Sequence, residues 1–133
     1  MKTRILLDTN FLMMPYKNRI DIFQEIDRLM ADKPGYELSV TQSVRCELER
    51  LAQEARGEDK VAAGLGLQLL EDKKVKVIEA EGALGADAQI IALAGGNRAA
   101  TVVCTNDRAL KKRLREMGVS VITMREKDHL DYV

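Results

Sequence analysis

The sequence contains no tryptophan, three tyrosines and two phenylalanines among its 133 residues. A core built from this chain must therefore be aliphatic, and few aromatic side chains remain for stacking on nucleic-acid bases. Cysteine is equally scarce, since Cys46 and Cys104 stand far apart in apolar surroundings and form no C-x-x-C pair. This spacing argues against a zinc site or a redox motif, and we expect both thiols to be buried and reduced.

Long apolar runs are also absent. No segment approaches the length that crosses a membrane, and Asp8 follows only three apolar residues, too few for the core of a signal peptide. We therefore expect a cytoplasmic protein without membrane contact. The length, with 46% hydrophobic and 32% charged residues, predicts one globular domain over residues 1–133.

The chain has no excess charge of either sign, because 21 basic residues balance 21 acidic ones. A neutral total weakens the case for nucleic-acid binding, which depends largely on Lys and Arg neutralising phosphates. The distribution, however, is uneven. Residues 108–127 contain seven basic side chains against two acidic ones, so the rest of the chain is acidic.

Short β-branched or apolar runs alternate with segments of helical periodicity. The runs that we expect to form strands are residues 5–7, 37–41, 75–78, 101–105 and 119–123. Helical spacing of apolar residues occurs in 22–30, 44–55, 90–94 and 110–114, and 57–71 is a further expected helix, weakened by Gly64 and Gly66. Alternation of this kind predicts an α/β fold, with a parallel sheet of about five strands covered by helices on both faces.

Four acidic residues stand out against this framework. Asp8 and Asp107 each come just after an expected strand, at the sheet edge where α/β proteins bind ligands. Each could equally be a simple N-cap of the helix that follows. Glu47 and Asp87 fall within the apolar stripes of their expected helices, where a carboxylate is costly unless it is paired or well hydrogen-bonded. For these two, a position at the edge of the stripe or a buried partner such as Arg4 or Arg45 is the alternative.

Carboxylates that converge on one cleft repel one another, so such a cluster would require a divalent cation. Oxygen ligands favour Mg²⁺ or Mn²⁺ over zinc. His129 is the sole histidine and lies in the expected C-terminal tail without a neighbouring Cys or His, so we expect a surface residue there.

The arrangement of these residues resembles the PIN-domain ribonucleases. The matching segments are 6–10 (LLDTN), 44–48 (VRCEL), 85–88 (GADA) with Ile90 and Ile91, and 105–110 (TNDRAL). They occur in the family's order and cover essentially the whole chain. The resemblance implies a three-layer PIN-like sandwich and a metal-dependent endoribonuclease.

The resemblance also implies a role for each site residue. Asp8, Asp87 and Asp107 would hold the principal metal, and Glu47 with Asp8 would serve a second metal or orient the attacking water. Asn10, Thr105 and Asn106 would support the cluster. No covalent protein nucleophile is needed for such metal-assisted hydrolysis.

Asp107 opens an expected helix that carries Arg108, Lys111, Lys112 and Arg115. These side chains could form a phosphate track into the cleft, or a solvated face whose positive charge suits the end of a helix dipole. We expect the substrate to be a single-stranded RNA. Because aromatic side chains are so few, we expect little sequence recognition by stacking.

Several functional settings remain open at this stage. Residues 105–115 and 123–130 look closer to the archaeal and eukaryotic rRNA-processing PIN proteins than to VapC-type toxins, whose motifs are the same. The corresponding partners would be a ribosome-assembly complex or an antitoxin, and the family also allows a homodimer. A third reading keeps the fold but makes the chain a non-catalytic RNA-binding or assembly factor. A phospho-receiver, a P-loop or dinucleotide-binding protein and a haloacid dehalogenase each lack residues that their chemistry needs.

Overall fold

The structure is a computed structural model that describes residues 2–33, 35–80 and 85–133. Its centre is a six-stranded sheet with the order β3-β2-β1-β4-β5-β6. The strands are β1 (Arg4–Leu7), β2 (Glu37–Thr41), β3 (Lys76–Ile78), β4 (Thr101–Cys104), β5 (Ser120–Arg125) and β6 (His129–Tyr132). The first five run parallel, and β6 pairs antiparallel with β5.

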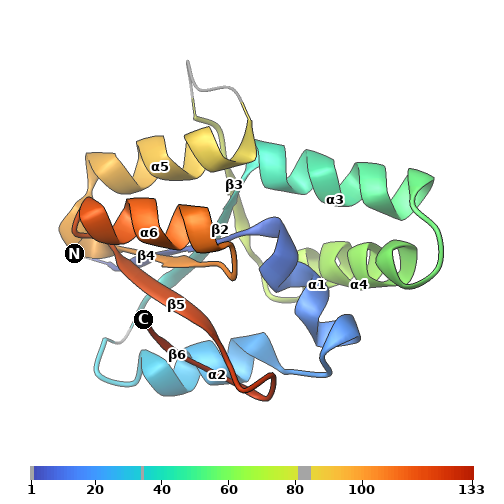
Figure 1. Ribbon diagram of the computed structural model, residues 1–133, viewed down its shortest axis with the longest axis horizontal. Coiled ribbons are helices and arrows are strands. Elements are labelled where there is room, and N and C mark those ends of the chain that lie inside the picture. The colour runs from blue at the N-terminus through green and yellow to red at the C-terminus, as the bar shows by residue number, and fades with distance from the viewer. Residues whose placement is uncertain (1, 34, 81–84) are drawn as a thin grey trace.

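Six α-helices surround this sheet (Figure 1). They are α1 (Thr9–Lys17), α2 (Ile22–Leu29), α3 (Gln42–Glu54), α4 (Glu58–Asp72), α5 (Ala86–Gly96) and α6 (Arg108–Glu116), and a short 3₁₀ turn, η1 (Arg98–Ala100), precedes β4. In Figure 1, α5 and α6 lie on one side of the sheet and α2 on the other. Helices α1, α3 and α4 form a group beside the carboxyl ends of β1 and β2.

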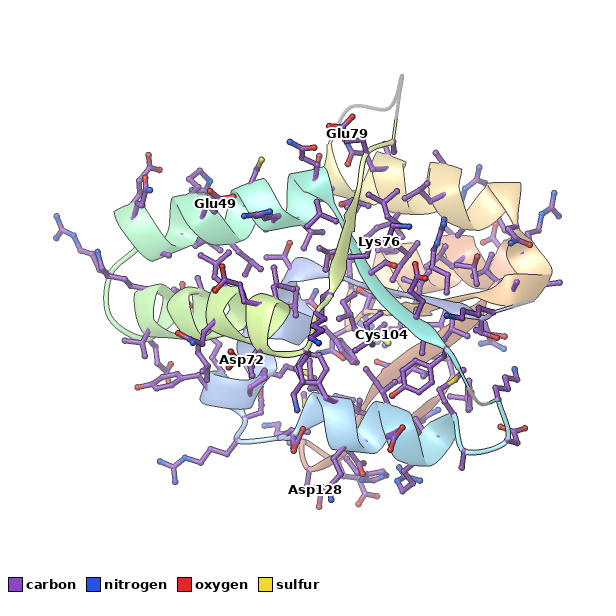
Figure 2. All side chains as sticks on the ribbon, turned by 180° about the vertical axis from the view of Figure 1, so that it is seen from behind. Glu49, Asp72, Lys76, Glu79, Cys104 and Asp128 are labelled. Carbon is purple, nitrogen blue, oxygen red and sulfur yellow. The ribbon has the colours of Figure 1, made fainter. Side chains whose placement is uncertain are left out.

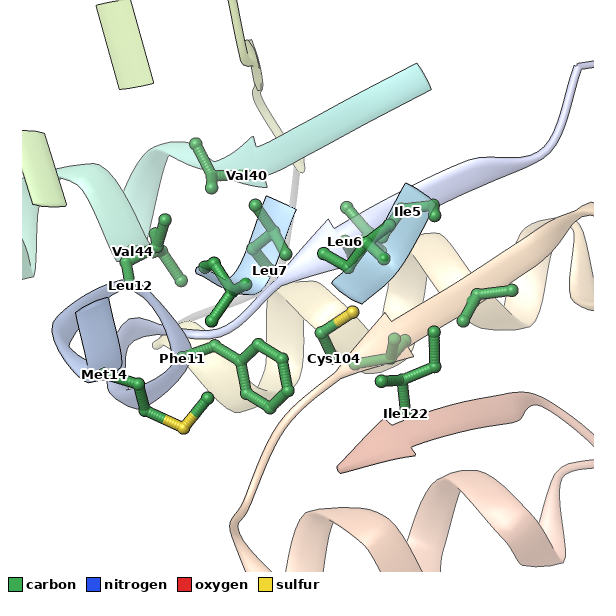
Figure 3. Close-up of a cluster of buried hydrophobic side chains, with 14 of the residues drawn as sticks. Ile5, Leu6, Leu7, Phe11, Leu12, Met14, Val40, Val44, Cys104 and Ile122 are labelled. Carbon is green, nitrogen blue, oxygen red and sulfur yellow. The ribbon is translucent and has the colours of Figure 1, made fainter. Parts of the chain in front are cut away.

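The core is aliphatic, as the composition predicts. Strands β1 and β4 are buried on both faces, and Figure 3 shows their side chains packed with Phe11, Leu12 and Met14 of α1. The two phenylalanines, Phe11 and Phe23, are both buried. Charged side chains such as Glu49 and Asp72 lie on the outer surfaces of α3 and α4 (Figure 2).

The C-terminal segment departs from the expected five-strand parallel sheet. Residues 123–130, expected to be a tail, contain the end of β5 and the start of β6. The residues around His129 therefore form a sheet edge. Two hydrogen bonds fasten β6 to α2: the guanidinium of Arg28 donates to the Leu130 carbonyl at 2.7 Å, and the Leu130 amide donates to Glu25 at 3.0 Å. These partners are about a hundred residues apart, so local sequence patterns did not reveal them.

Helix α4 is continuous through both of its glycines, although we expected them to weaken it. Gly66 faces α1 so closely that a Cβ placed there would lie 2.8 Å from the Leu12 carbonyl oxygen. Gly64 has nothing within 4 Å of the corresponding position. Gly66 therefore permits the close approach of α1 and α4, and this contact compensates for its poor helix propensity.

The two cysteines differ in their environments. Cys104 is fully buried in β4, as expected, and burial raises the pKa of its thiol well above the usual range. Cys46 is exposed on α3, so the expectation that both thiols are buried was wrong. The apolar stripe of α3 passes through Val44 and Leu48 and leaves Cys46 on the solvent side. Among the described residues, no helix is long and apolar enough to cross a membrane.

Candidate active site

The register of the parallel strands brings the ends of β1, β2 and β4 to one level. Leu7 of β1 lies opposite Cys104 of β4, so the next residues along the two strands, Asp8 and Thr105, also meet. On the other side, Leu6 lies opposite Ser39, which brings Thr41 at the end of β2 to the level of Asp8. Three chain segments thus turn into helices or loops along one edge of the sheet.

Asp8 is the most constrained acid of the site. Its carboxylate accepts hydrogen bonds from the Thr9 amide at 2.8 Å and from the Thr105 hydroxyl at 2.7 Å, and a longer one from Asn10 at 3.4 Å. Asp8 is both the N-cap of α1 and only 5% exposed. Capping and a place in the cleft are therefore compatible functions of this one side chain.

Asp107 has the same double position at the start of α6. One oxygen of its carboxylate caps the helix by accepting from the Leu110 amide at 2.8 Å. Its own amide donates to the Thr105 hydroxyl at 3.1 Å, and that hydroxyl in turn donates to Asp8. Thr105 therefore joins the two strand-end acids through one hydroxyl group.

Glu47 and Asp87 are less buried than their helical spacing predicted. Glu47 is half-buried on α3, and Asp87 is exposed in the first turn of α5. The inward orientation expected for Asp87 was therefore wrong, because the residues that α5 buries are Ile90 and Ala94, in its second and third turns. The alternative of a buried arginine partner does not hold either, because no ion pair between described residues involves Glu47 or Asp87, and Arg45 pairs with Glu49 on the surface.

All four acids nevertheless line one pocket of about 230 Å³, together with Thr9, Asn10, Met13, Leu51 and Ala86. None of the described Lys, Arg or His side chains lines it. The electrostatic consequence appears in the pKa values. Burial raises the pKa of Asp8, its hydrogen bonds from Thr105 and Thr9 lower it, and the charges of Asp87 and Asp107 raise it further. The pKa of Asp87 is also raised, first by partial loss of solvent and then by Asp107 and Glu47.

The donor chemistry of this pocket fits a divalent cation. Four carboxylates without a basic side chain among them provide oxygen ligands and an excess of negative charge, as Mg²⁺ or Mn²⁺ requires. Thr9, which also lines the pocket, has a buried hydroxyl without a hydrogen-bond partner among the described residues. As placed, no three acidic, histidine or cysteine side chains in the described part of the chain converge on one point as metal ligands. Glu47 is half-buried, and Asp87 and Asp107 are exposed, so a cation can reach these carboxylates from solvent.

Asn106 fastens the loop between Thr105 and Asp107. Its side-chain oxygen accepts from the Met124 amide at 3.0 Å and from the Thr123 hydroxyl at 3.2 Å. Its backbone amide donates to Asn10 at 3.3 Å, so the loop is tied both to β5 and to α1. Asn10, Thr105 and Asn106, which we expected to support the cluster, are thus linked by hydrogen bonds to the acids or to one another.

Two residues near the site were not expected from the sequence. Thr9 lines the pocket, and its signal was its place inside the Asp8-Thr9-Asn10 segment. Thr123 connects Asn106 to α6, because its hydroxyl also accepts from the Lys111 ammonium at 3.3 Å. Only the packing of β5 against α6 brings Thr123 to this position, so no local signal was available.

The four basic residues expected to contact RNA lie outside the acid pocket, in an adjoining stretch of α6. Arg108, Lys111, Lys112 and Arg115 line a second cavity of about 560 Å³ with Glu116 and Val133. Their spacing places them on one face of the helix, which begins at the capping acid Asp107.

Comparison with known families agrees with this geometry. A model of the PIN like domain family matches residues 5–127. The chain belongs to this PIN-like family. It is 32% identical over 130 residues to Ribonuclease VapC4 of Methanocaldococcus jannaschii, an alignment that covers 96% of this chain and 95% of that protein. It is 33% identical over 120 residues to Ribonuclease VapC9 of Archaeoglobus fulgidus, covering 90% and 82%.

The PIN-like fold is also supported by a solved structure. The PIN domain endonuclease Utp24 superposes with a TM-score of 0.76 at 20% identity, covering 98% of this chain and 92% of that one. Identity at this level supports the fold alone. The expected α/β PIN-like architecture is therefore confirmed, with six strands in place of about five.

Proposed function

We propose that this PIN-like chain is a metal-dependent endoribonuclease that hydrolyses phosphodiester bonds in RNA. The observation that carries the proposal is the pocket lined by Asp8, Glu47, Asp87 and Asp107 without a cationic side chain. The names of the two relatives, both ribonucleases aligned over most of their length, support it.

Each acid has a separate task in this proposal. Asp8, Asp87 and Asp107 hold the principal Mg²⁺ or Mn²⁺, and Glu47 with Asp8 holds a second ion or orients the attacking water. A cation bound there lowers the pKa of a water molecule and neutralises charge that develops on the phosphate. Thr105 fixes the Asp8 carboxylate, and Thr105 and Asn106 together hold the loop that carries Asp107, as groups that orient metal ligands do.

The substrate would be held mainly through its backbone. The basic side chains Arg108, Lys111, Lys112 and Arg115 adjoin Asp107 and can neutralise phosphates without reading bases. The substrate in this proposal is a single-stranded RNA. Because no aromatic side chain of the described residues lines either the acid pocket or the basic cavity, its bases would not stack on aromatic side chains there.

The same activity fits two biological settings. An rRNA-processing role is the first, with a ribosome-assembly partner, and a VapC-type toxin ribonuclease with an antitoxin is the second. The second is favoured by the names of the two relatives. Controlled expression followed by mapping of new RNA ends separates them, because processing yields defined rRNA termini and a toxin cleaves other RNAs and arrests growth.

The decisive experiment replaces Asp8 with Asn. We expect Asp8→Asn to abolish Mn²⁺-dependent cleavage of single-stranded RNA while RNA binding is largely kept, because the side chain keeps its shape and loses its charge. Asp72→Asn, an exposed acid at the end of α4, is the matched control and should cleave normally. Undiminished cleavage by Asp8→Asn would refute the assignment. Wild-type protein that binds RNA but never cleaves it would favour the non-catalytic RNA-binding factor.

A further inference from the structure

Helix α6 carries the densest positive charge of the described chain. Five of its nine residues are basic, and Glu116 is its single acid. None of the five basic side chains forms an ion pair within the described residues. Lys111 has a hydroxyl partner, Thr123, and the other four have none. Unpaired cations are available to phosphates without first breaking an internal contact.

The opposite side of the acid pocket differs in this respect. Helix α3, which carries Glu47, has two arginines, and each is neutralised on the helix itself, Arg45 by Glu49 and Arg50 by Glu54. Helix α4, packed beside it, has four acidic residues against one basic. Along these two helices Lys60 is the one basic side chain without an acidic partner among the described residues, and its ammonium donates to the Gln53 carbonyl at 3.4 Å. A polyanion leaving the pocket on this side would therefore meet far less free positive charge than along α6.

The free charge on α6 also lines one open cavity at the surface. Arg108, Lys111, Lys112 and Arg115 line the cavity of about 560 Å³, with Glu116 as its one acidic side chain, whereas Arg113 lies outside it. From Arg108 to Arg115 the helix rises about 10 Å. At roughly 3.4 Å per nucleotide of a stacked strand, this length matches about three nucleotides.

From this asymmetry we infer that α6 holds the RNA on one flank of the scissile phosphodiester, over about three nucleotides, and that the other flank is not held. The inference rests on the proposed ribonuclease function, because that function places the reacting phosphate at the acid pocket. It adds to that function a requirement on the substrate. Cleavage requires a minimum number of nucleotides on one particular side of the cut, whatever their sequence.

The first test compares two arginines of the same helix. Binding of an unstructured 12-nucleotide RNA is measured by fluorescence anisotropy in EDTA, so that no metal-dependent cleavage occurs, over a range of salt concentrations. Each phosphate contact of a single strand contributes about 0.7 to the slope of log K against log salt. Arg115→Ala should reduce the slope by about 0.7 and Lys112→Ala/Arg115→Ala by about 1.4, while Arg113→Ala leaves it unchanged. Equal slopes for Arg113→Ala and Arg115→Ala would overturn the inference.

The second test concerns the direction. Unstructured RNA of mixed sequence, labelled at its 5′ or its 3′ end, is cleaved with Mn²⁺, and the cut positions are mapped. We expect cuts to be excluded from about three nucleotides at one end only, and Lys112→Ala/Arg115→Ala to shorten that zone. The inference would be contradicted if the regions without cuts were equally long at both ends of the RNA, or if the double variant left the length of that region unchanged. Absence of all cleavage would refute the proposed function, and the salt slopes would still decide whether α6 holds RNA.

Discussion

At the scale of single residues, Asp8 shows that a helix cap and a site residue can be the same side chain. From the sequence, the physical argument for a place in the site was stronger for Glu47 and Asp87 than for Asp8 and Asp107. The helical spacing of Glu47 and Asp87 predicted that their side chains point inward. In the structure Asp8 is the buried acid, held by the Thr9 amide and the Thr105 hydroxyl. The pattern of residues 5–8 did not reveal this burial, because it results from β4 lying beside β1.

Asp87 provides a test of charge repulsion in the pocket. Its pKa is raised above 3.8 in the folded chain. The stabilising contribution of the protonated carboxyl is therefore complete below pH 3.8 and is lost as the pH rises through the folded pKa. In EDTA at pH 7, Asp87→Asn should increase the free energy of unfolding, by no more than about 0.5 kcal/mol because the residue is exposed.

Denaturant unfolding at a series of pH values measures this effect. The gain should shrink as the pH falls toward 3.8, and with Mn²⁺ present it should reverse, because the variant lacks one ligand. A gain that does not vary with pH would show that repulsion is not its cause.

Asn106 provides a test of positioning. Asn106→Ala removes the acceptor for the Met124 amide and the Thr123 hydroxyl, which frees the loop that carries Asp107. We expect Mn²⁺ affinity, measured by calorimetry, to fall about tenfold or more, as for other groups that orient metal ligands. Thr123→Val keeps the Met124 contact and should have a smaller effect. An unchanged affinity in Asn106→Ala would contradict a positioning role.

At the scale of elements, the contact between α1 and α4 explains why helix propensity alone predicted a weakened helix at residues 57–71. Gly64 and Gly66 both lower the propensity of residues 57–71 to form a helix, yet α4 is unbroken. Gly66 is needed where the Leu12 carbonyl approaches, whereas nothing near Gly64 requires a glycine. Propensity describes the isolated helix, and the packing of α1 decides the outcome.

The two glycines should therefore respond in opposite ways to the same change. Gly66→Ala would place its Cβ 2.8 Å from a backbone oxygen and should destabilise the fold by about 1–3 kcal/mol. Gly64→Ala should stabilise it by about 0.5–1 kcal/mol, because alanine favours the helix and meets no obstacle. Urea unfolding of both variants measures the difference, and equal effects would contradict this account of the α1–α4 contact.

Regular alternation made most elements predictable. Strand β2 matches its expected range of 37–41, and β1, β3, β4 and β5 differ from theirs by one or two residues at an end. Helix α1 was expected only as the helix that Asp8 would cap, and β6 was missed. Both have weak local patterns: α1 contains Pro15, and β6 is four residues long with charged neighbours. Tertiary contacts, of α1 with α4 and of β6 with α2, hold them in place.

At the scale of the whole molecule, the four acids come from four separate segments, and no segment has a site by itself. The sequence identified which residues belong together through their resemblance to a family. It did not give their relative burial, since that depends on how β1, β4, α3 and α5 meet. The pocket is therefore a property of the complete fold.

Metal binding should consequently stabilise the entire domain. A ligand that binds only the folded state raises the free energy of unfolding, by about 2.7 kcal/mol at one hundred times its dissociation constant. We expect Mn²⁺ to raise the Tm of the wild type in calorimetry and to leave that of Asp8→Asn nearly unchanged, with Asp72→Asn behaving as wild type. An equal rise in Asp8→Asn would place the ion elsewhere.

The order of the strands has a further consequence for the nascent chain. Strand β1 lies between β2 and β4, but β4 begins at Thr101, so one edge of β1 stays open while the intervening chain is translated. At ordinary elongation speeds this interval is roughly 5 to 20 s. Neither Thr105 nor Asp107 exists during that time, and the acid pocket cannot form. A ribonuclease built in this way is unable to cut the message or the ribosome from which it is emerging until most of its chain has been made.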